Sequence, residues 1–220
     1  MSTSGDNQVP ERIPRLGWAV AFVAATIVIA WAYAQFGASM RNRTVSPRLE
    51  KYAPAPEFQF TAQDGSTVST ADLKGKIWVA NFIFTRCAGP CPVMTSRMAQ
   101  LNQSLGSKVK DVELITITVD PENDTPEVLK SYAEKVGVSP RWRFLTGPKD
   151  EIEKTVSKGF LQTLSKEPSG VPVHSTRFVL VDKDGWMRGF QDGNDPEVVQ
   201  KLLMDIGDVL RESPSVPSKQ

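Results

Sequence analysis

The stretch KIWVANFIFTRCAGPCP, residues 76–92, decides the fold of this 220-residue chain. Residues 76–84 are an almost continuous apolar run, which is typical of a central strand buried on both faces of a sheet. Residues 94–105 then place apolar side chains at the spacing of one helix face. Cys87 and Cys91 therefore lie at a turn that leads from a buried strand into a helix.

The chain beyond this stretch alternates between strand and helix patterns. We predict further strands at residues 112–119, 142–145, 177–182 and 186–190, and helices that start at residue 125 and span residues 149–157 and 196–211. Thr125 followed by Pro126 has the pattern of a helix start, with the cap first and proline at the first helical position. Asp184-Gly185 between two apolar runs indicates a hairpin. This order predicts an α/β fold with a mixed sheet flanked by helices.

The N-terminal region has a different composition. Residues 16–36, LGWAVAFVAATIVIAWAYAQF, carry no charge, and a membrane-spanning helix needs about 20 apolar residues. Trp18, Trp31 and Tyr33 lie near the two ends, as interfacial aromatic residues do. We predict a short cytoplasmic segment (1–15), a transmembrane helix (16–37), an extended tether (38–55), a globular domain (56–212) and a disordered tail (213–220).

A removable signal peptide is the alternative interpretation of the apolar segment. Ala32-Tyr33-Ala34 has the pattern of a cleavage site, but the apolar run is longer than the roughly 7–15 residues usual in signal peptides. The length favours an uncleaved anchor. The formal net charge of the chain is only +1, and no basic stripe is present, which argues against a nucleic-acid partner.

Two cysteines and one histidine carry the candidate chemistry. Cys87 and Cys91 follow a central strand, and α/β proteins form their sites beyond the carboxyl ends of strands. A helix N-terminus also lowers the pKa of a nearby thiol. His174 precedes the strand predicted at 177–182, and we expect it beside the cysteine turn. Two thiolates and one imidazole form a soft ligand set that favours Cu(I) over hard ions.

Other uses of two cysteines fit less well. Structural zinc sites take four ligands, and the chain has no second cysteine pair. Covalent haem attachment requires Cys-x-x-Cys-His, which is absent. A structural disulfide outside the cytoplasm is an alternative, although such a short loop removes little chain entropy.

At these residues the chain resembles the Sco/SenC family, thioredoxin-like copper chaperones of cytochrome c oxidase assembly. The resemblance covers about residues 56–210 and rests on FTRCAGPCP (84–92), TVDPENDTP (118–126), and HST (174–176) followed by FVLVD (178–182). Family members usually carry Cys-Pro-x-x-Cys and an acidic residue before the histidine, whereas this chain has Ala88-Gly89-Pro90 and Val173. Ser175 aligns with the cis-proline of thioredoxins.

The resemblance implies that residues 56–212 form a thioredoxin-like copper-binding domain. It implies that Cys87, Cys91 and His174 bind copper, as Cu(I) or Cu(II), and that the cysteines can form a disulfide. The implied acceptor is the copper-binding subunit of cytochrome c oxidase, with a thiol–disulfide reductant or another copper chaperone as further partners. The implied location is the inner (cytoplasmic) membrane, with a single-pass anchor and the domain in the periplasm or extracytoplasmic space.

Three other functions stay open at this point. The cysteine pair also fits a membrane-anchored thiol–disulfide oxidoreductase that acts on cysteines of the oxidase or of other extracytoplasmic proteins. Thr85-Arg86-Cys87 resembles the Thr-x-x-Cys of thiol peroxidases, with a spacing one residue short and no role for His174. A non-catalytic assembly factor would need neither cysteine. We expect Asp120 and Asp124 to shape the neighbouring loop, with Asp124 as a helix-start residue and not a ligand.

Overall fold

The structure is a computed structural model that describes residues 23–33, 49–106, 109–166 and 172–212. The chain divides into two compact units, residues 1–47 and 48–220. In the first unit, residues 23–33 form a helix. Among the described residues, no helix has the length and apolar character needed to cross a membrane. The predicted span 16–37 extends beyond the described helix on both sides, so its ends lie outside the described residues.

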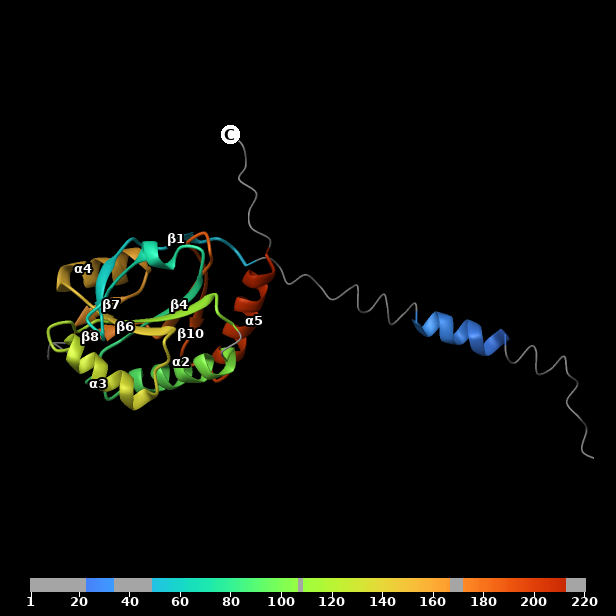
Figure 1. Ribbon diagram of the computed structural model, residues 1–220, viewed down its shortest axis with the longest axis horizontal. Helices are drawn as coiled ribbons and strands as arrows, with labels where there is room; N and C mark the ends of the chain where they lie inside the picture. Colours follow the sequence, from blue (N-terminus) through green and yellow to red (C-terminus); the bar gives the residue numbers. More distant parts are fainter. Residues whose placement is uncertain (1–22, 34–48, 107–108, 167–171, 213–220) are drawn as a thin grey trace, which may run out of the picture. The chain divides into compact units, whose positions relative to one another are not determined.

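Within the described part of the second unit, eight strands form one mixed sheet (Figure 1). The strands are β1 (Ala53–Pro54), β2 (Gln59–Ala62), β3 (Thr67–Ser69), β4 (Ile77–Ile83), β5 (Val112–Thr118), β6 (Trp142–Thr146), β9 (Arg177–Val181) and β10 (Trp186–Asp192). Their spatial order is β1-β10-β9-β4-β5-β6-β2-β3. Strands β4, β5 and β6 are parallel, and the other pairs are antiparallel. The carboxyl ends of β4 and β5 therefore lie side by side at one edge of the sheet.

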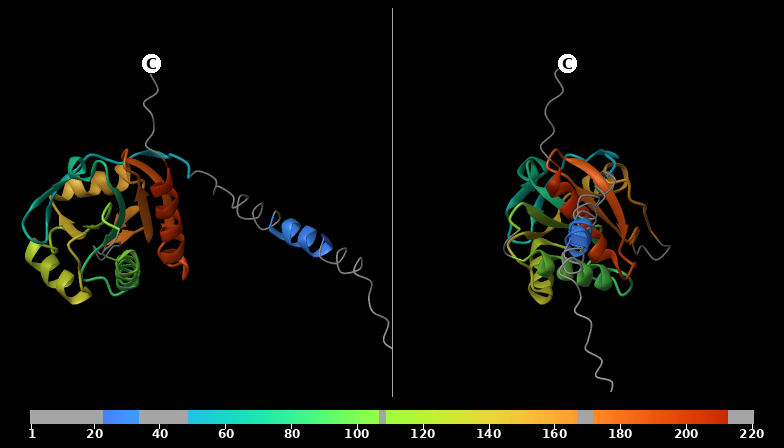
Figure 2. Two further views of the ribbon diagram at one scale, coloured as in Figure 1. Left: turned by 45° about the vertical axis from the view of Figure 1, so that its right-hand side comes forward. Right: turned by 90° about the vertical axis from the view of Figure 1, so that its right-hand side faces the viewer.

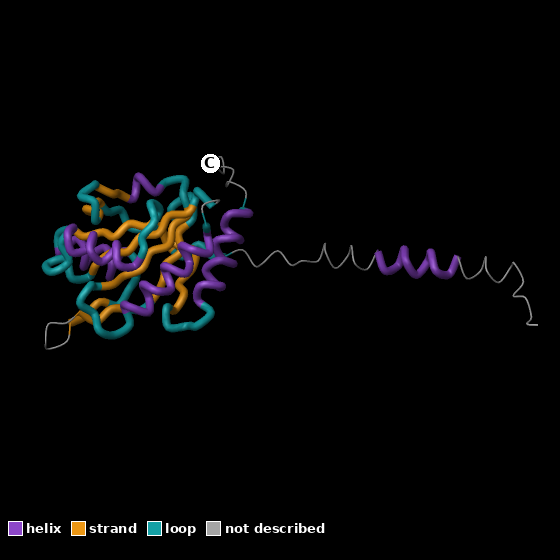
Figure 3. Tube along the Cα trace, turned by 60° about the horizontal axis from the view of Figure 1, so that its bottom comes forward, coloured by secondary structure: helices purple, strands orange, loops and turns teal. Residues whose placement is uncertain are grey.

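Helices cover both faces of this sheet. They are the 3-10 turn η1 (Thr70–Leu73), α2 (Cys91–Leu105), α3 (Pro126–Val136), α4 (Lys149–Lys154) with the π-helical turn η2 (Thr155–Gly159), and α5 (Val198–Arg211). Helix α2 contacts α3 and α5 on one face, and α4 lies on the other (Figures 1 and 2). Figure 3 shows the strands as a layer between these helices. The predicted α/β architecture, a mixed sheet flanked by helices, is confirmed.

Strand β4 is the centre of the core, and all seven of its residues are buried. On the face toward α4, Phe160 lies between Trp78 and Phe82, with ring centroids 5.9 Å and 5.1 Å away. Phe160 itself is completely buried. Aromatic pairs at such distances add to the burial energy and fix the rings in place. The segment that follows the π-helical turn is thus held firmly to the sheet.

Local signals predicted the main elements well. Helix α3 starts as expected, since the Thr125 side chain accepts a hydrogen bond from the Val128 amide at 3.4 Å and proline follows the cap. The hairpin of β9 and β10 is also present, and Gly185 in its turn has a left-handed φ of 82°. A second sheet was not predicted. It consists of β7 (Leu164–Lys166) and β8 (Pro172–His174), which are antiparallel.

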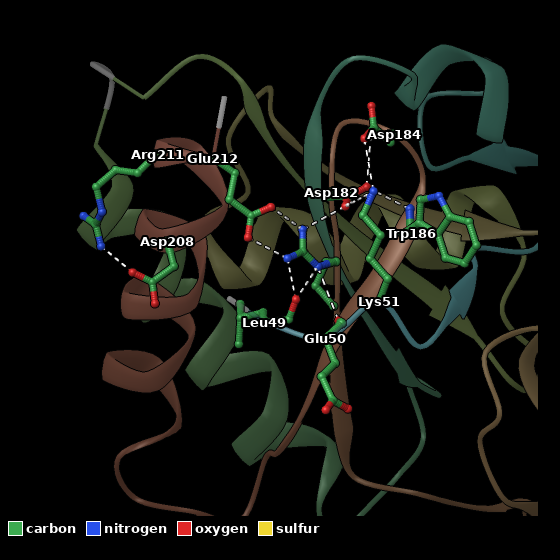
Figure 4. Close-up of polar contacts among 10 residues, drawn as sticks. Leu49, Glu50, Lys51, Asp182, Asp184, Trp186, Asp208, Arg211 and Glu212 are labelled. Carbon is green, nitrogen blue, oxygen red and sulfur yellow. Dashed lines mark hydrogen bonds and ion pairs between the residues drawn. The ribbon is translucent and has the colours of Figure 1, made fainter. Parts of the chain in front are cut away.

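Arg188 of β10 joins the two ends of the described domain. Its guanidinium is 2% exposed and donates to Asp182 Oδ2 at 3.0 Å and to Glu212 Oε1 at 2.6 Å. Its Nε also donates to the Leu49 carbonyl oxygen at 3.1 Å (Figure 4). Residues 49–55 of the predicted tether lie within the described part of the chain. Ala53 and Pro54 form β1, and the segment is bound to β10 through this strand and through the Arg188 contact. The chain therefore approaches the sheet at the end opposite the cysteine turn.

Candidate functional site

The cysteine turn connects β4 to α2. Residues 84–90 leave the sheet edge, and α2 begins at Cys91, whose side chain is 1% exposed. Cys87 lies on the turn itself and is partly exposed. Both cysteines are free thiols. One sulfur therefore belongs to the core and the other to a surface turn.

His174 lies against the buried cysteine, as the sequence predicted. Its Nε2 is 3.3 Å from Cys91 Sγ, although 83 residues separate the two. Its Nδ1 is 3.0 Å from the carbonyl oxygen of Ser175. A carbonyl oxygen can only accept a hydrogen bond, so this contact assigns the imidazole proton to Nδ1. The lone pair of Nε2 then points toward the thiol, which is the arrangement a metal-binding imidazole needs.

The site favours uncharged groups in the absence of a ligand. Burial lowers the pKa of His174, and the hydrogen bond to the Ser175 carbonyl offsets this only in part. Burial also raises the pKa of the Cys91 thiol well above its ordinary value, with a further contribution from the neighbouring Cys87 thiol. The expectation that a helix N-terminus lowers a thiol pKa is wrong for Cys91, because its desolvation outweighs the helix dipole.

Asp124 fixes the start of the cysteine turn. Its carboxylate is wholly buried and accepts hydrogen bonds from the Thr85 amide at 3.0 Å, the Thr85 hydroxyl at 2.5 Å and the Thr118 hydroxyl at 2.5 Å. Thr125, not Asp124, caps the helix. The expected role of Asp124 in shaping the loop is therefore correct, but its side chain acts on the cysteine turn and not on the helix start.

Asp120 makes the second contact between the loops at this edge. Its carboxylate accepts a hydrogen bond from Arg86 Nη2 at 2.8 Å and others from the Asn123 side chain at 2.8 Å and 3.0 Å. Arg86 directly precedes Cys87. The segment after β5 thus holds the turn after β4 at two successive residues, 85 and 86.

Of the three predicted ligands, Cys91 and His174 are in contact. The Cys87 thiol, on the turn, neighbours the Cys91 thiol at the start of α2. Among the described residues, no three Cys, His, Asp or Glu side chains already form a closed metal-binding group. Gln162 also belongs to this region, since it accepts a hydrogen bond from the Ser175 hydroxyl. No pattern in the sequence distinguishes Gln162 from other polar loop residues, so it could not have been predicted.

The fold and these contacts define the class of protein. A mixed sheet flanked by helices, with a cysteine pair between the central strand and its helix, is a thioredoxin-like architecture. The histidine next to the second cysteine distinguishes it within that class.

Comparison with known proteins gives the family. The SCO1/SenC family model matches residues 47–209, and the chain belongs to this family. A curated relative, the SCO1 protein homolog of Bacillus subtilis, is 39% identical over 153 residues, which is 68% of this chain and 79% of that protein. The predicted family resemblance is confirmed.

Two solved structures are similar over the whole domain. BsSco, a member of the Sco family of cytochrome c oxidase assembly proteins in which a disulfide switch has been identified, superimposes with a TM-score of 0.64 at 36% identity. That match covers 72% of this chain and 95% of BsSco. Bradyrhizobium japonicum ScoI with copper bound has a TM-score of 0.62 at 27% identity, covering 71% of this chain and 99% of ScoI.

Proposed function

We propose that this protein is a copper chaperone that holds one copper ion with Cys87, Cys91 and His174 and delivers it to the copper-binding subunit of cytochrome c oxidase. The observation that carries the proposal is the 3.3 Å contact between Cys91 Sγ and His174 Nε2, with the imidazole proton on the other nitrogen. Two ligand atoms from distant parts of the chain thus already face each other.

The donor set fits copper as a cargo. Two thiolates and one imidazole match the preference of Cu(I) for soft ligands, and the imidazole also suits Cu(II). Because burial raises the pKa of Cys91, copper binding must displace the proton of this thiol. Cys87 lies on the partly exposed turn, so it completes the set from the solvent side. A cargo ion enters and leaves from that side.

The relatives support this assignment. ScoI of Bradyrhizobium japonicum has been solved with copper bound, and BsSco belongs to a family of cytochrome c oxidase assembly proteins. The disulfide switch of BsSco also supports a redox control of the cysteine pair here. Oxidation of Cys87 and Cys91 to a disulfide removes both thiolates, so a thiol–disulfide reductant must act before copper binds. Copper itself comes from another copper chaperone or from the surrounding solution.

We also propose that residues 16–37 anchor the protein in the cytoplasmic membrane, with the domain on the extracytoplasmic side. The uncharged sequence of this segment is the argument. Reporter fusions after residue 211 test the topology. Activity of a cytoplasmic reporter alone would exclude it.

Anaerobic copper titration of the purified full-length protein in detergent tests the function. The reduced protein should bind one copper ion per chain, and the disulfide form should bind none. His174→Ala should weaken Cu(I) binding in part, because two thiolates still hold Cu(I), and should weaken Cu(II) binding more. Circular dichroism controls for folding. Equal affinities of wild type and His174→Ala for both copper states would overturn the ligand assignment.

A thiol–disulfide oxidoreductase is the second candidate, favoured by the two adjacent free thiols. It predicts that His174→Ala leaves copper binding unchanged and that the protein reduces disulfides of its partner in the absence of copper. The raised pKa of Cys91 argues against this candidate for that sulfur, since the thiolate is the attacking species.

A further inference from the structure

A series of hydrogen bonds leads from the segment before β7 to the imidazole of His174. Gln162 lies in the segment between η2 and β7, and its side chain is 3% exposed. Its Nε2 donates to the Phe160 carbonyl oxygen at 2.7 Å, and its Oε1 accepts from the Ser175 hydroxyl. Both the nitrogen and the oxygen of the Gln162 carboxamide therefore make a hydrogen bond within the protein.

Ser175 connects Gln162 to the imidazole of His174 through hydrogen bonds. Its amide donates to the Thr163 carbonyl oxygen at 3.0 Å, and its hydroxyl donates to Gln162. Both contacts fix the backbone of Ser175, whose carbonyl oxygen accepts from His174 Nδ1 at 3.0 Å. The orientation of that carbonyl decides which way Nε2 points.

The end of this hydrogen-bond series that lies away from His174 is rigid. Phe160 is completely buried among the rings of the sheet core, so the carbonyl oxygen that accepts from Gln162 has a fixed position. Leu161 between them has φ of 57°, and it is the one non-glycine residue with positive φ in the described part of the chain. Its side chain is 54% exposed. A bulky residue with that backbone is uncommon and persists only where its surroundings impose it.

We propose that Gln162 is a positioning residue for His174: by holding Ser175 it turns the imidazole so that Nε2 faces Cys91. The inference rests on the proposed copper function and concerns how the same site is built. The left-handed turn at Leu161 brings the Gln162 side chain into the interior. The backbone amide of Gln162 also donates to the Val156 carbonyl oxygen at 3.1 Å. Removing the carboxamide leaves the ligands in place but frees the ring.

The expected effect is on copper and not mainly on folding. Loss of an outer hydrogen bond that orients a metal-binding histidine typically weakens binding about 10- to 100-fold. Gln162→Met keeps the size of the side chain and removes both hydrogen bonds. Because Gln162 acts on the ring through Ser175, this variant should weaken Cu(II) binding by up to about that factor and shift the Cu(II) spectrum toward that of His174→Ala. Cu(I), which two thiolates hold, should be affected less.

The experiment is copper titration and electron paramagnetic resonance of the full-length protein in detergent. Ser175→Ala breaks the same series of hydrogen bonds at its second link and should reproduce the effect, while Ser175→Thr retains the hydroxyl and should restore wild-type binding. Gln63→Leu is the matched control, because the Gln63 side chain also accepts a hydrogen bond, from the Phe144 amide at 2.8 Å, but lies elsewhere. It should leave the copper spectrum unchanged.

A double variant separates positioning from general damage. If Gln162 acts through His174, Gln162→Met should have no further effect on copper binding once His174 is alanine. If Gln162→Met fails to fold, the Ser175 pair carries the test. A normal spectrum and affinity in both Gln162→Met and Ser175→Ala, with His174→Ala impaired, overturns this inference alone. If every variant, His174→Ala included, binds copper as the wild type does, the proposed function is overturned as well.

Discussion

Removing the Asp124 carboxylate should destabilise the domain far more than removing an exposed carboxylate with similar bonds. In Asp124→Ala the partly buried Thr85 amide and hydroxyl and the buried Thr118 hydroxyl all lose an acceptor that is itself fully buried. Hydrogen bonds to a charged group contribute about 1.5–3 kcal/mol each. The hydroxyls can rotate toward other acceptors, so we expect a net loss of about 2–4 kcal/mol and not the full sum.

The assay is urea denaturation of the reduced protein, supported by thermal unfolding. For a domain of this size, each kcal/mol lowers Tm by about 2–4 °C, so the expected decrease is roughly 5–15 °C. Asp124→Asn keeps the shape and should lose about half as much, because an amide still accepts from the Thr85 amide without the charge.

Asp64→Ala is the matched control. The Asp64 carboxylate accepts from the Ser66 amide at 2.9 Å and from the Ser66 hydroxyl at 2.6 Å, but both residues are exposed. Water replaces these bonds, so the loss should stay within about 1 kcal/mol. If Asp124→Ala is no more destabilised than Asp64→Ala, the buried carboxylate does not fix the cysteine turn and the reasoning is refuted.

Three further predictions concern the burial of other side chains. Arg188→Met should lower the free energy of unfolding by about 3–5 kcal/mol in urea denaturation, because it breaks a buried ion pair. The control Arg211→Met changes a side chain that is 74% exposed and should lower it by about 0.5 kcal/mol or less. Equal losses would contradict the burial argument. Because burial lowers the pKa of His174, the unfolded chain binds a proton at this imidazole at higher pH than the folded protein does. The metal-free protein should therefore lose stability as pH falls below about 6.5, and His174→Gln should remove this pH dependence. An unchanged pH dependence in this variant would contradict the prediction. Iodoacetamide should label Cys87 before Cys91, which is 1% exposed and has a raised pKa, as peptide mass spectrometry can measure; the reverse order would contradict the described burial.

Local sequence patterns were sufficient for the framework of the domain. The apolar run 76–84 predicted β4, and the helical spacing after the cysteines predicted α2, because burial on a strand or along a helix face imposes a period on the sequence itself. Thr125-Pro126 and Asp184-Gly185 predicted a helix start and a hairpin turn for the same reason, since caps and tight turns are chosen by neighbouring residues.

Short or irregular pairings were missed. Strands β7 and β8 have three residues each and no alternating pattern, so their sequence does not distinguish them from loop. The sequence nevertheless selected His174 as a candidate ligand, because it is the single histidine of the chain and the family motif includes it.

The sequence by itself determined the family, the central strand, the cysteine turn and the identity of the candidate ligands. Only the tertiary structure decided which nitrogen of His174 faces Cys91, that Gln162 accepts a hydrogen bond from Ser175 and Asp124 one from Thr85, and that Cys91 is too buried for a lowered pKa. The physical reason is separation along the chain. These contacts join segments 83, 13 and 39 residues apart, and periodicity reports only which face of its own element a residue occupies.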